Sequence, residues 1–267
     1  TAAIVAGGPA PNNNLVELWN GSSWTETTEM ASGKENGASA GISTAFITFG
    51  GVPPSTGDVN TFEWNGSAWA EKADMNQAKR NLAGFGTYTA ALAAGGETPP
   101  VTANVESYNG SSWSEESTIP VAKAGGTVLG SEPAALSVGG VSPGPGGPEA
   151  GIFATQEYDG SSWTAGGSLP AGRRALNNSG FGSQTAAVQS GGLIPGGVQN
   201  TSNEYNGSSW TAGNAINTNR YVHAGAGTLT AGIISSGVGA APSYTSLTNV
   251  EEYDGTTFTA VNSMSTG

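Results

Sequence analysis

One short phrase returns six times along this chain of 267 residues, and each copy has the form of a β-hairpin. A glutamate lies within two residues of an aromatic residue, Asn-Gly or Asp-Gly follows, and two small residues lead to a second aromatic residue. The copies begin at Glu17, Phe62, Glu106, Glu157, Glu204 and Glu252. Because regular repetition is the sequence signature of repeat architectures, this phrase constrains the fold more than any other feature.

A second phrase alternates with the hairpins, and it is a stretch of small apolar residues that ends in glycine. Its copies begin at Thr1, Thr44, Thr89, Pro133, Thr185 and Thr230. Five of them end in the double glycines Gly7, Gly8, Gly50, Gly51, Gly95, Gly96, Gly139, Gly140, Gly191 and Gly192. The hairpins close on Trp24, Trp69, Trp113, Trp163, Trp210 and Phe258, at steps of 45, 44, 50, 47 and 48 residues. A repeat of this length, built of short strands, predicts the blades of a β-propeller.

Four antiparallel strands are predicted in each repeat, and the second complete copy shows them most clearly. They cover residues 81–88, 89–96, 104–108 and 111–116. Between the last two strands, Asn109 and Gly110 suit the central positions of a type I′ turn, where both residues need positive φ. We therefore expect an all-β fold, a six-bladed β-propeller with four antiparallel strands per blade, forming a single domain over residues 1–267.

The aromatic residues on either side of each turn have two readings. Tyr158 and Trp163 would present large side chains to the adjacent blade, where their area contributes to packing. Platforms for stacking sugars are the alternative, and the near-identical placement in every repeat favours packing.

The repeated acids also have two interpretations. One acid per blade favours hydrogen bonds or ion pairs between blades over paired-carboxylate catalysis. These acids are Glu17, Glu63, Glu106, Glu157, Glu204 and Glu252.

The combined pattern resembles the kelch repeat over the whole chain: a double glycine after the second strand, a Glu-aromatic pair, a tight turn and a Trp. Two features depart from it, because only four residues separate Tyr158 from Trp163, and because the last repeat has Gly237-Val238 and Phe258 in place of Gly-Gly and Trp. The amino-acid sequence of the hairpins is also similar to that of kelch-like arrays in structural and tail proteins of marine bacteriophages. The resemblance implies a propeller on a virion or cell surface.

Composition excludes several classes of function. The formal net charge is −12, with eight Lys and Arg, so we expect no nucleic-acid partner. The chain has no Cys, which excludes disulfides and thiol catalysis, and its single His and lack of Asp-x-Asp-x-Asp clusters give no support for a metal site or another cofactor. No apolar run of about 18 residues occurs, so we expect no membrane insertion.

The count of predicted strands is uneven. Six copies exist of strands two, three and four but only five of strand one, since the chain opens on a second strand and stops at residues 264–267, just before a first strand is due. We expect one blade to lack its first strand, and we expect the chain to be part of a longer protein or assembly. A differently placed sixth blade is the alternative.

Long, variable loops on a rigid scaffold are where binding specificity is usually carried. Here they join the second and third strands, beginning at Pro9, Val52, Glu97, Val141, Leu193 and Gly239. Seven of the eight basic residues fall where the chain leads into a first strand, namely Lys34, Lys79, Arg80, Lys123, Arg173, Arg174 and Arg220. They could form a cationic collar for an acidic glycan, or they could bond loop carbonyls and neighbouring acids. The candidate ligand-binding residues are Lys34, Arg80, Lys123, Arg174, Arg220, Tyr221 and His223.

Two hypotheses on function follow. The first is a non-enzymatic adhesion or structural propeller, extracellular or on a virion surface, that recognises a glycan or a surface or virion protein through its long loops. The second is a glycan-active enzyme of propeller type, such as a sialidase-like protein, whose site would gather Arg174, Arg220, Tyr221 and His223 together with a glutamate. Because no Ser-His-Asp relay can be assembled around one His, we favour the first and expect no catalytic residues.

Overall fold

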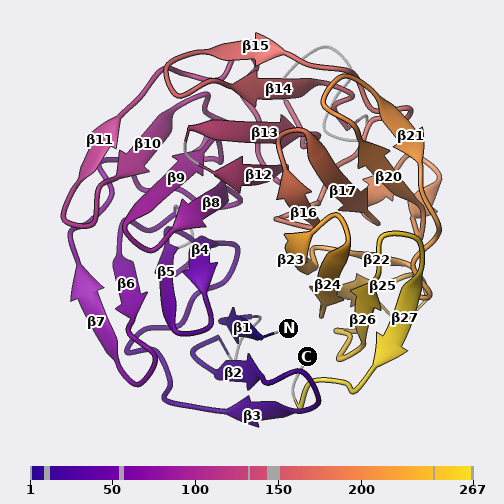
Figure 1. Ribbon diagram of the computed structural model, residues 1–267. Coiled ribbons are helices and arrows are strands. Elements are labelled where there is room, and N and C mark those ends of the chain that lie inside the picture. Colours follow the sequence, from indigo (N-terminus) through magenta and orange to yellow (C-terminus); the bar gives the residue numbers. More distant parts are fainter. Residues whose placement is uncertain are drawn as a thin grey trace. The chain divides into compact units, whose positions relative to one another are not determined.

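The computed structural model describes residues 2–8, 13–53, 57–131, 133–142, 151–242 and 244–265. In these ranges the regular elements are β-strands, which form two compact units, Thr1–Ala124 and Gly125–Gly267. Each unit contains three antiparallel sheets of three or four strands that follow one another along the chain, as the labels of Figure 1 show. We call these sheets blades 1 to 6.

The first unit contains blades 1 to 3. Blade 1 has three strands, β1 (Ala3–Ala6), β2 (Val16–Trp19) and β3 (Trp24–Glu26). Blade 2 has β4 (Ala38–Ile42), β5 (Ala45–Phe49), β6 (Thr61–Trp64) and β7 (Trp69–Lys72). Blade 3 has β8 (Ala83–Thr87), β9 (Ala90–Ala94), β10 (Val105–Tyr108) and β11 (Trp113–Glu115). The first strands β4 and β8 lie side by side.

The second unit contains blades 4 to 6. Blade 4 has β12 (Thr127–Ser131), β13 (Ala134–Val138), β14 (Thr155–Tyr158) and β15 (Trp163–Ala165). Blade 5 has β16 (Gly180–Ser183), β17 (Ala186–Ser190), β20 (Ser202–Tyr205) and β21 (Trp210–Ala212). Blade 6 has β23 (Ala224–Thr228), β24 (Ala231–Ser235), β26 (Val250–Tyr253) and β27 (Phe258–Val261). The loops of blades 5 and 6 add the short strands β18 (Leu193–Ile194), β19 (Gly197–Val198), β22 (Arg220–Tyr221) and β25 (Val238–Gly239).

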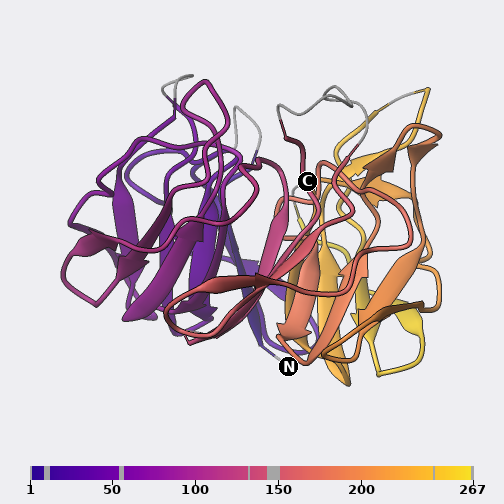
Figure 2. The ribbon, with the colours of Figure 1, turned by 90° about the horizontal axis from the view of Figure 1, so that it is seen from above.

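The predicted fold class, an all-β six-bladed propeller, is confirmed. Strand order within every blade is sequential and antiparallel, and five blades have four strands. The described residues of blade 1 form only β1, β2 and β3, as expected from the strand count. In each unit the short turns lie at one end of the strands and the long loops at the other, which Figure 2 shows from the side. That the chain is one domain stays a prediction.

The turn between the third and fourth strands differs from the predicted type I′ turn. Tyr108 pairs directly with Trp113, so the loop has four residues instead of two. Its backbone φ is positive at Gly110 but not at Asn109. The Asn109 side chain closes the loop instead, because its Oδ1 accepts hydrogen bonds from the Ser111 and Ser112 amides, both at 3.0 Å. Asn-Gly therefore begins a four-residue turn that is closed by the Asn side chain. The prediction of a two-residue turn did not consider this hydrogen bonding by the Asn side chain.

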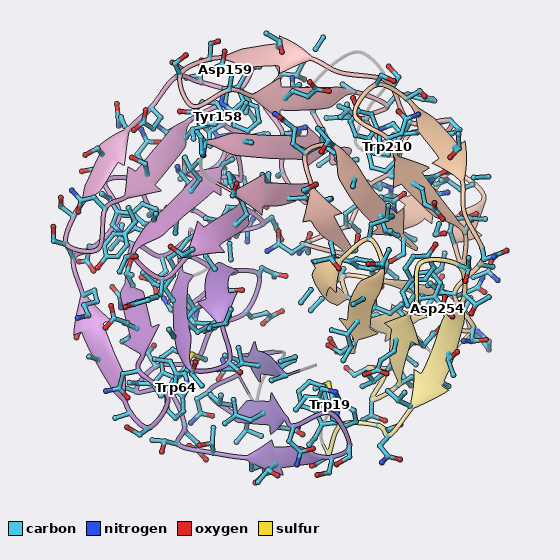
Figure 3. The ribbon with its side chains drawn as sticks, in the orientation of Figure 1. Trp19, Trp64, Tyr158, Asp159, Trp210 and Asp254 are labelled. Atoms are coloured by element: carbon cyan, nitrogen blue, oxygen red, sulfur yellow. The ribbon has the colours of Figure 1, made fainter. Side chains whose placement is uncertain are left out.

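The same capped turn occurs with Asp in blades 4 and 6. Asp159 accepts hydrogen bonds from the amides of Ser161 and Ser162 at 2.9 and 2.8 Å. These bonds, together with those from the two serine hydroxyls, lower the pKa of Asp159 to about 2. Figure 3 places Asp159 at the outer margin of its blade, with Tyr158 on the inward side. The repeated turn is thus a surface loop that is closed by its own Asn or Asp side chain.

The aromatic residues beside each turn pack between neighbouring blades. Trp113 of blade 3 contacts Phe49 of blade 2 edge-on, with 4.8 Å between ring centroids. Its Nε1 donates a hydrogen bond of 3.0 Å to Thr61 Oγ1, also in blade 2. In the second unit, Trp210 Nε1 of blade 5 donates to Thr155 Oγ1 of blade 4 at 2.9 Å. Trp113 and Trp210 are buried, and their indole nitrogens bond between blades, whereas Trp163 Nε1 has no hydrogen-bond partner among the described residues.

The repeated acids occupy two faces of the third strand, although the repeated phrase suggests one equivalent position for all six. Glu63, Glu157, Glu204 and Glu252 directly precede the aromatic residue, whereas Glu17 and Glu106 precede it by two. Since side chains alternate along a strand, the two sets point to opposite faces. Residues of the first set serve the expected link between blades in the second unit: Tyr205 Oη donates to Glu157 at 2.5 Å, and Tyr253 Oη donates to Glu204 at 2.6 Å.

Candidate ligand-binding face

The basic residues lie on five short stretches that connect one blade to the first strand of the next. We call these stretches the lead-in segments, residues 34–37, 79–82, 123–126, 173–178 and 220–223. Backbone pairing ties four of them to the long loops after the second strands, and it joins Glu35 to Val52, Arg80 to Glu97, Arg174 to Leu193 and Tyr221 to Val238. The lead-in segments thus lie at the long-loop end of their blades, where the sequence predicted a binding face.

The first residue of every lead-in segment is basic and buried. These residues are Lys34, Lys79, Lys123, Arg173 and Arg220. The second residue is half-buried at Glu35, Arg80, Arg174 and Tyr221. An extended backbone turns successive side chains to opposite sides, so the pair Lys79-Arg80 places one cation inside and the other at the surface. The predicted collar therefore divides into an interior set and a surface set.

Lys79 shows what the interior set does. Its Nζ forms an ion pair of 3.0 Å with Glu106 Oε1, and both side chains are fully buried. Glu106 Oε2 also accepts hydrogen bonds from the Asn76 amide at 2.6 Å and from its side chain at 3.0 Å. Burial lowers the pKa of Lys79, while Glu106 opposes the shift. Lys79, Glu106 and Asn76 form a closed polar cluster that anchors the chain leading into blade 3.

Blade 6 repeats this cluster with arginine. Arg220 Nη2 lies 2.7 Å from Glu251 Oε1, and neither side chain is more than 1% exposed. Arg220 Nη1 donates to the carbonyls of Ser236 at 3.0 Å and Asn249 at 2.9 Å. Asn217 binds the other oxygen of Glu251, at 2.7 Å from its amide. Arg220 was predicted as a ligand contact, but its donors are directed to groups within its own blade.

Lys34 and Arg173 are held in related ways. Lys34 Nζ forms an ion pair with Asp58 and lies 5.2 Å from the ring centroid of Phe62, which occupies the strand position of Glu106. Arg173 has no acid there and donates instead to Gly191 O at 3.3 Å and Thr201 Oγ1 at 2.5 Å. In each case burial lowers the pKa of the basic group. Both side chains are 5% exposed or less, which leaves little surface for a ligand.

Lys123 is the exception in the interior set. Its side chain is buried, and its Nζ has no hydrogen-bond partner among the described residues. Burial lowers the pKa of Lys123 to about 7. The strand position that carries Glu106 in blade 3 and Glu251 in blade 6 carries Gln156 in blade 4. At neutral pH a side chain with this pKa is divided about equally between its charged and neutral forms.

His223 is also buried, at 1% exposure. Its Nε2 lies 3.0 Å from Ser190 Oγ, and that hydroxyl donates to the Ser179 carbonyl at 3.0 Å. Burial and the nearby charge of Arg220 lower the pKa of His223 to about 3. The Ser190 hydroxyl is fully buried, so this pair belongs to the packing between blades 5 and 6.

The surface set is chemically varied. Arg80 forms an ion pair of 3.1 Å with Glu97, and these two side chains are 30% and 23% exposed. Asn81 Nδ2 donates to the same carboxylate at 2.6 Å. In the second unit, Arg174 and Tyr221 occupy the position of Arg80 and are half-buried. Of the seven predicted ligand residues, Arg80, Arg174 and Tyr221 retain accessible surface, while Lys34, Lys123, Arg220 and His223 are buried.

The third residue of every lead-in segment has a left-handed backbone. Its φ is +56° at Asn36, +51° at Asn81, +61° at Gly125, +53° at Ala175 and +53° at Val222. This geometry links neighbouring blades, since the Asn81 amide donates to Asn36 O at 2.8 Å and the Val222 amide donates to Ala175 O at 2.9 Å. A positive φ is costly for a branched residue such as Val222, so tertiary bonds hold these segments in place.

Sequence reasoning missed four exposed apolar residues. Phe153 and Tyr244, in the long loops of blades 4 and 6, are 52% and 58% exposed. Ile42 and Tyr88, at the first turns of blades 2 and 3, are 66% and 38% exposed. None belongs to the repeated phrases, so the repeat gave no signal for them. Parts of the predicted long loops, residues 9–12, 54–56, 143–150 and 243, lie outside the described residues.

The described ranges contain no group of three or more His, Cys, Asp or Glu side chains placed to hold a metal ion. They also contain no helix with the length and apolar character of a membrane span.

Comparison with known proteins supports the fold alone. No protein-family model matches the chain, and no curated protein matches it. Among solved structures, one described as "Structure of YjhT" is similar with a TM-score of 0.75 and 13% sequence identity. The similarity covers 98% of this chain and 94% of that one. At this identity the shared property is the propeller architecture.

Proposed function

We propose that this protein is a non-enzymatic binding propeller that recognises a glycan or a partner protein through the long-loop end of its blades. The observation that carries the proposal is the division of the lead-in segments. Their buried first position is basic in every copy, whereas their second position is half-buried in four copies, which hold Glu35, Arg80, Arg174 and Tyr221, and is the buried Ala124 in the fifth. Variation at surface positions of a rigid scaffold is the usual arrangement of a binding face.

The proposed location is a virion or cell surface, for example a bacteriophage tail or surface appendage. The proposed scaffold is a kelch-type repeat. This part of the proposal is supported by the repeated hairpin sequence and by the low content of charged residues, which make up 10% of the chain. The enzyme alternative draws on the same four residues as before, but Arg220 and His223 are buried and engaged with other groups. The binding reading therefore has the stronger support.

A glycan array and a protein pull-down with the purified chain test the proposal. We expect saturable binding to at least one glycan or protein, and we expect the variant Arg80→Gln/Arg174→Gln to bind it more weakly with an unchanged melting temperature. Lys72→Gln, a change in a half-buried ion pair with Glu63 at another position of blade 2, is the control that should bind normally. Absence of any binder would contradict the proposal, and catalytic turnover of a bound glycan would favour the enzyme alternative.

A further inference from the structure

Strand β1 is the edge strand of blade 1, and among the described residues it pairs with β2 alone. Val5 of β1 lies opposite Glu17 of β2 in this pairing. In blades 2 and 3 the equivalent strands β5 and β9 are paired on both edges. Figure 1 shows the difference within the first unit, because β1 is the innermost strand of its blade, whereas β4 and β8 lie inside β5 and β9. One edge of β1 can therefore pair with a further strand.

The side chains of β1 are also less buried than those of every equivalent strand. All four residues of β1 are half-buried. The four residues in the same register are fully buried in each of the other blades, namely residues 46–49, 91–94, 135–138, 187–190 and 232–235. The residue types are similar, since Ala3-Ile4-Val5-Ala6 corresponds to Ala91-Leu92-Ala93-Ala94 in blade 3. An apolar edge strand of this kind is what binding by strand addition uses.

The described residues contain no spare strand for this edge. The five first strands, β4, β8, β12, β16 and β23, are each paired with the second strand of their own blade. A second copy of the chain would have to open one of its own blades to supply such a strand. The structure therefore favours a strand from a different polypeptide.

The five first strands show which residue such a strand needs next to its end. The residue before the last is glycine in every blade, with φ between +108° and +113°. A Cβ on Gly41 would lie 2.2 Å from the carbonyl oxygen of Ala45, which begins β5. Ala3 and Phe46 occupy the same register position, so Ala2 corresponds to Ala45. A strand added to β1 therefore needs glycine at the position of Gly41.

The residue before this glycine would lie opposite Ile4. In the two other blades with Ile at this position, the opposite residue is alanine: Ile47 faces Ala40 in blade 2, and Ile233 faces Ala226 in blade 6. Blades 3, 4 and 5 have Leu or Val there, with Phe or Leu opposite. Because cross-strand neighbours pack against each other, we expect Ala-Gly in the added strand.

The third strand of blade 1 provides an acid near the start of the added segment. Glu17 is buried, at 2% exposure, and has the strand position of Glu106 and Glu251. Those two carboxylates form ion pairs with Lys79 and Arg220, each of which precedes the first strand of its blade by four residues. A basic residue at this spacing in the added segment would approach Glu17 in the same way and form a charge-assisted bond.

We infer that β1 is a strand-addition site for an extended segment of another polypeptide. The segment has a Lys or Arg, three residues of any type, a small residue, one further residue, and then Ala-Gly. Its backbone supplies the hydrogen bonds to β1, while the glycine and the basic residue supply specificity. The site is a strand edge and not part of the long loops, so the inference goes beyond the proposed function and does not depend on it.

A synthetic peptide with the sequence of residues 34–42, KENGASAGI, has all of these features. Adding it to the purified protein should slow amide hydrogen exchange at residues 3–6. Exchange at residues 91–94 should not change, because this equivalent strand is already paired on both edges. Absence of binding, or slower exchange only at other residues, would overturn the inference.

The Gly41→Ala version of the peptide tests the predicted specificity. Fluorescence anisotropy of labelled peptides should show that it binds at least about tenfold more weakly, because its Cβ would meet the backbone at the start of β1. Equal affinity for the two peptides would contradict addition in the register of the other blades.

The protein variant Glu17→Gln tests the charge. The wild type should bind the peptide about threefold or more tightly than its Lys34→Gln version, and Glu17→Gln should remove this preference. The comparison is made within each protein, so an effect of Glu17→Gln on blade 1 itself cancels. A preference that survives in the variant would overturn the assignment of Glu17 as the partner of the basic residue.

Other occupants of the edge give different results. Slow exchange at residues 3–6 in the purified protein without peptide would show that the edge is already covered, and it would overturn the inference. If light scattering then reported a dimer, the occupant would be a second copy of the chain.

Discussion

At the scale of single residues, alternation along the lead-in segments separates cations that hold the structure from cations that can meet a ligand. Lys79 and Arg80 are adjacent in sequence, yet one is fully buried against Glu106 and the other is 30% exposed beside Glu97. Composition cannot separate the two, and neither can the repeat pattern, because both residues are basic. The separating information is the side to which each side chain points, which follows from the strand-like geometry of the segment.

Lys123 gives a prediction about pH. Its pKa is lowered to about 7 in the folded protein, against 10.5 for an ordinary lysine, so between these values the unfolded chain binds the additional proton. The Lys123 contribution to the free energy of unfolding should therefore rise as the pH increases from 7 to 10.5 and be flat below 7. Lys123→Met should stabilise the protein by a few kcal/mol at pH 7, since it removes the cost of a buried, unpartnered amine.

Chemical denaturation of wild type and Lys123→Met at several pH values measures both effects. Lys72→Met is the matched control, because Lys72 is one-third exposed and its ion pair with Glu63 is worth little. A stability difference between wild type and Lys123→Met that does not change between pH 7 and 10 would contradict the assignment of a lowered pKa.

At the scale of the element, most of each blade could be predicted from the sequence. The strand ranges 81–88, 89–96, 104–108 and 111–116 each contain an observed strand, β8 to β11. The turn chemistry could not be predicted fully, because Asn-Gly suits a two-residue turn and a side-chain-capped four-residue turn equally well. The repeated acids were treated as equivalent for a similar reason, because Glu106 and Glu157 occupy similar places in the repeated phrase. The two side chains nevertheless lie on opposite faces of their strands.

The Tyr–Glu bonds between blades give a prediction about stability. Tyr205→Phe removes the hydroxyl that donates to Glu157 and leaves a partly buried carboxylate without this donor, so it should cost about 1–3 kcal/mol of unfolding free energy. Tyr108→Phe is the matched control in blade 3, since the Tyr108 hydroxyl has no hydrogen-bond partner among the described residues. Thermal or urea unfolding compares the two, and equal losses would show that the Tyr205 bond does not link its blades.

The buried pair Lys79–Glu106 gives a second prediction at this scale. Lys79→Met and Glu106→Gln should each destabilise blade 3 by about 3–5 kcal/mol, because each leaves one buried group without its partner. The double variant should lose less than the sum of the two. The partly exposed pair Lys72–Glu63, treated in the same cycle, should show a coupling of about 1 kcal/mol or less. Additive losses for Lys79 and Glu106 would contradict the cluster described above.

At the scale of the whole molecule, the repeat predicts the number of blades, while function depends on what departs from the repeat. The exposed Phe153 and Tyr244 lie outside the repeated phrases, and sequence reasoning assigned neither of them a role. The candidate site could be placed at the long-loop end from loop length alone. Which residues there are accessible could not be predicted, because burial depends on contacts between blades that a single repeat does not contain.

The central claim is that the long-loop end of the blades is the binding face. The most direct measurement is amide hydrogen exchange with and without the glycan or protein found by the array or pull-down. The account predicts slower exchange on binding in the lead-in segments, above all around Arg80, Arg174 and Tyr221, and in the loops that bridge to them. Slower exchange confined to the opposite end, at turns such as residues 109–112, would contradict it.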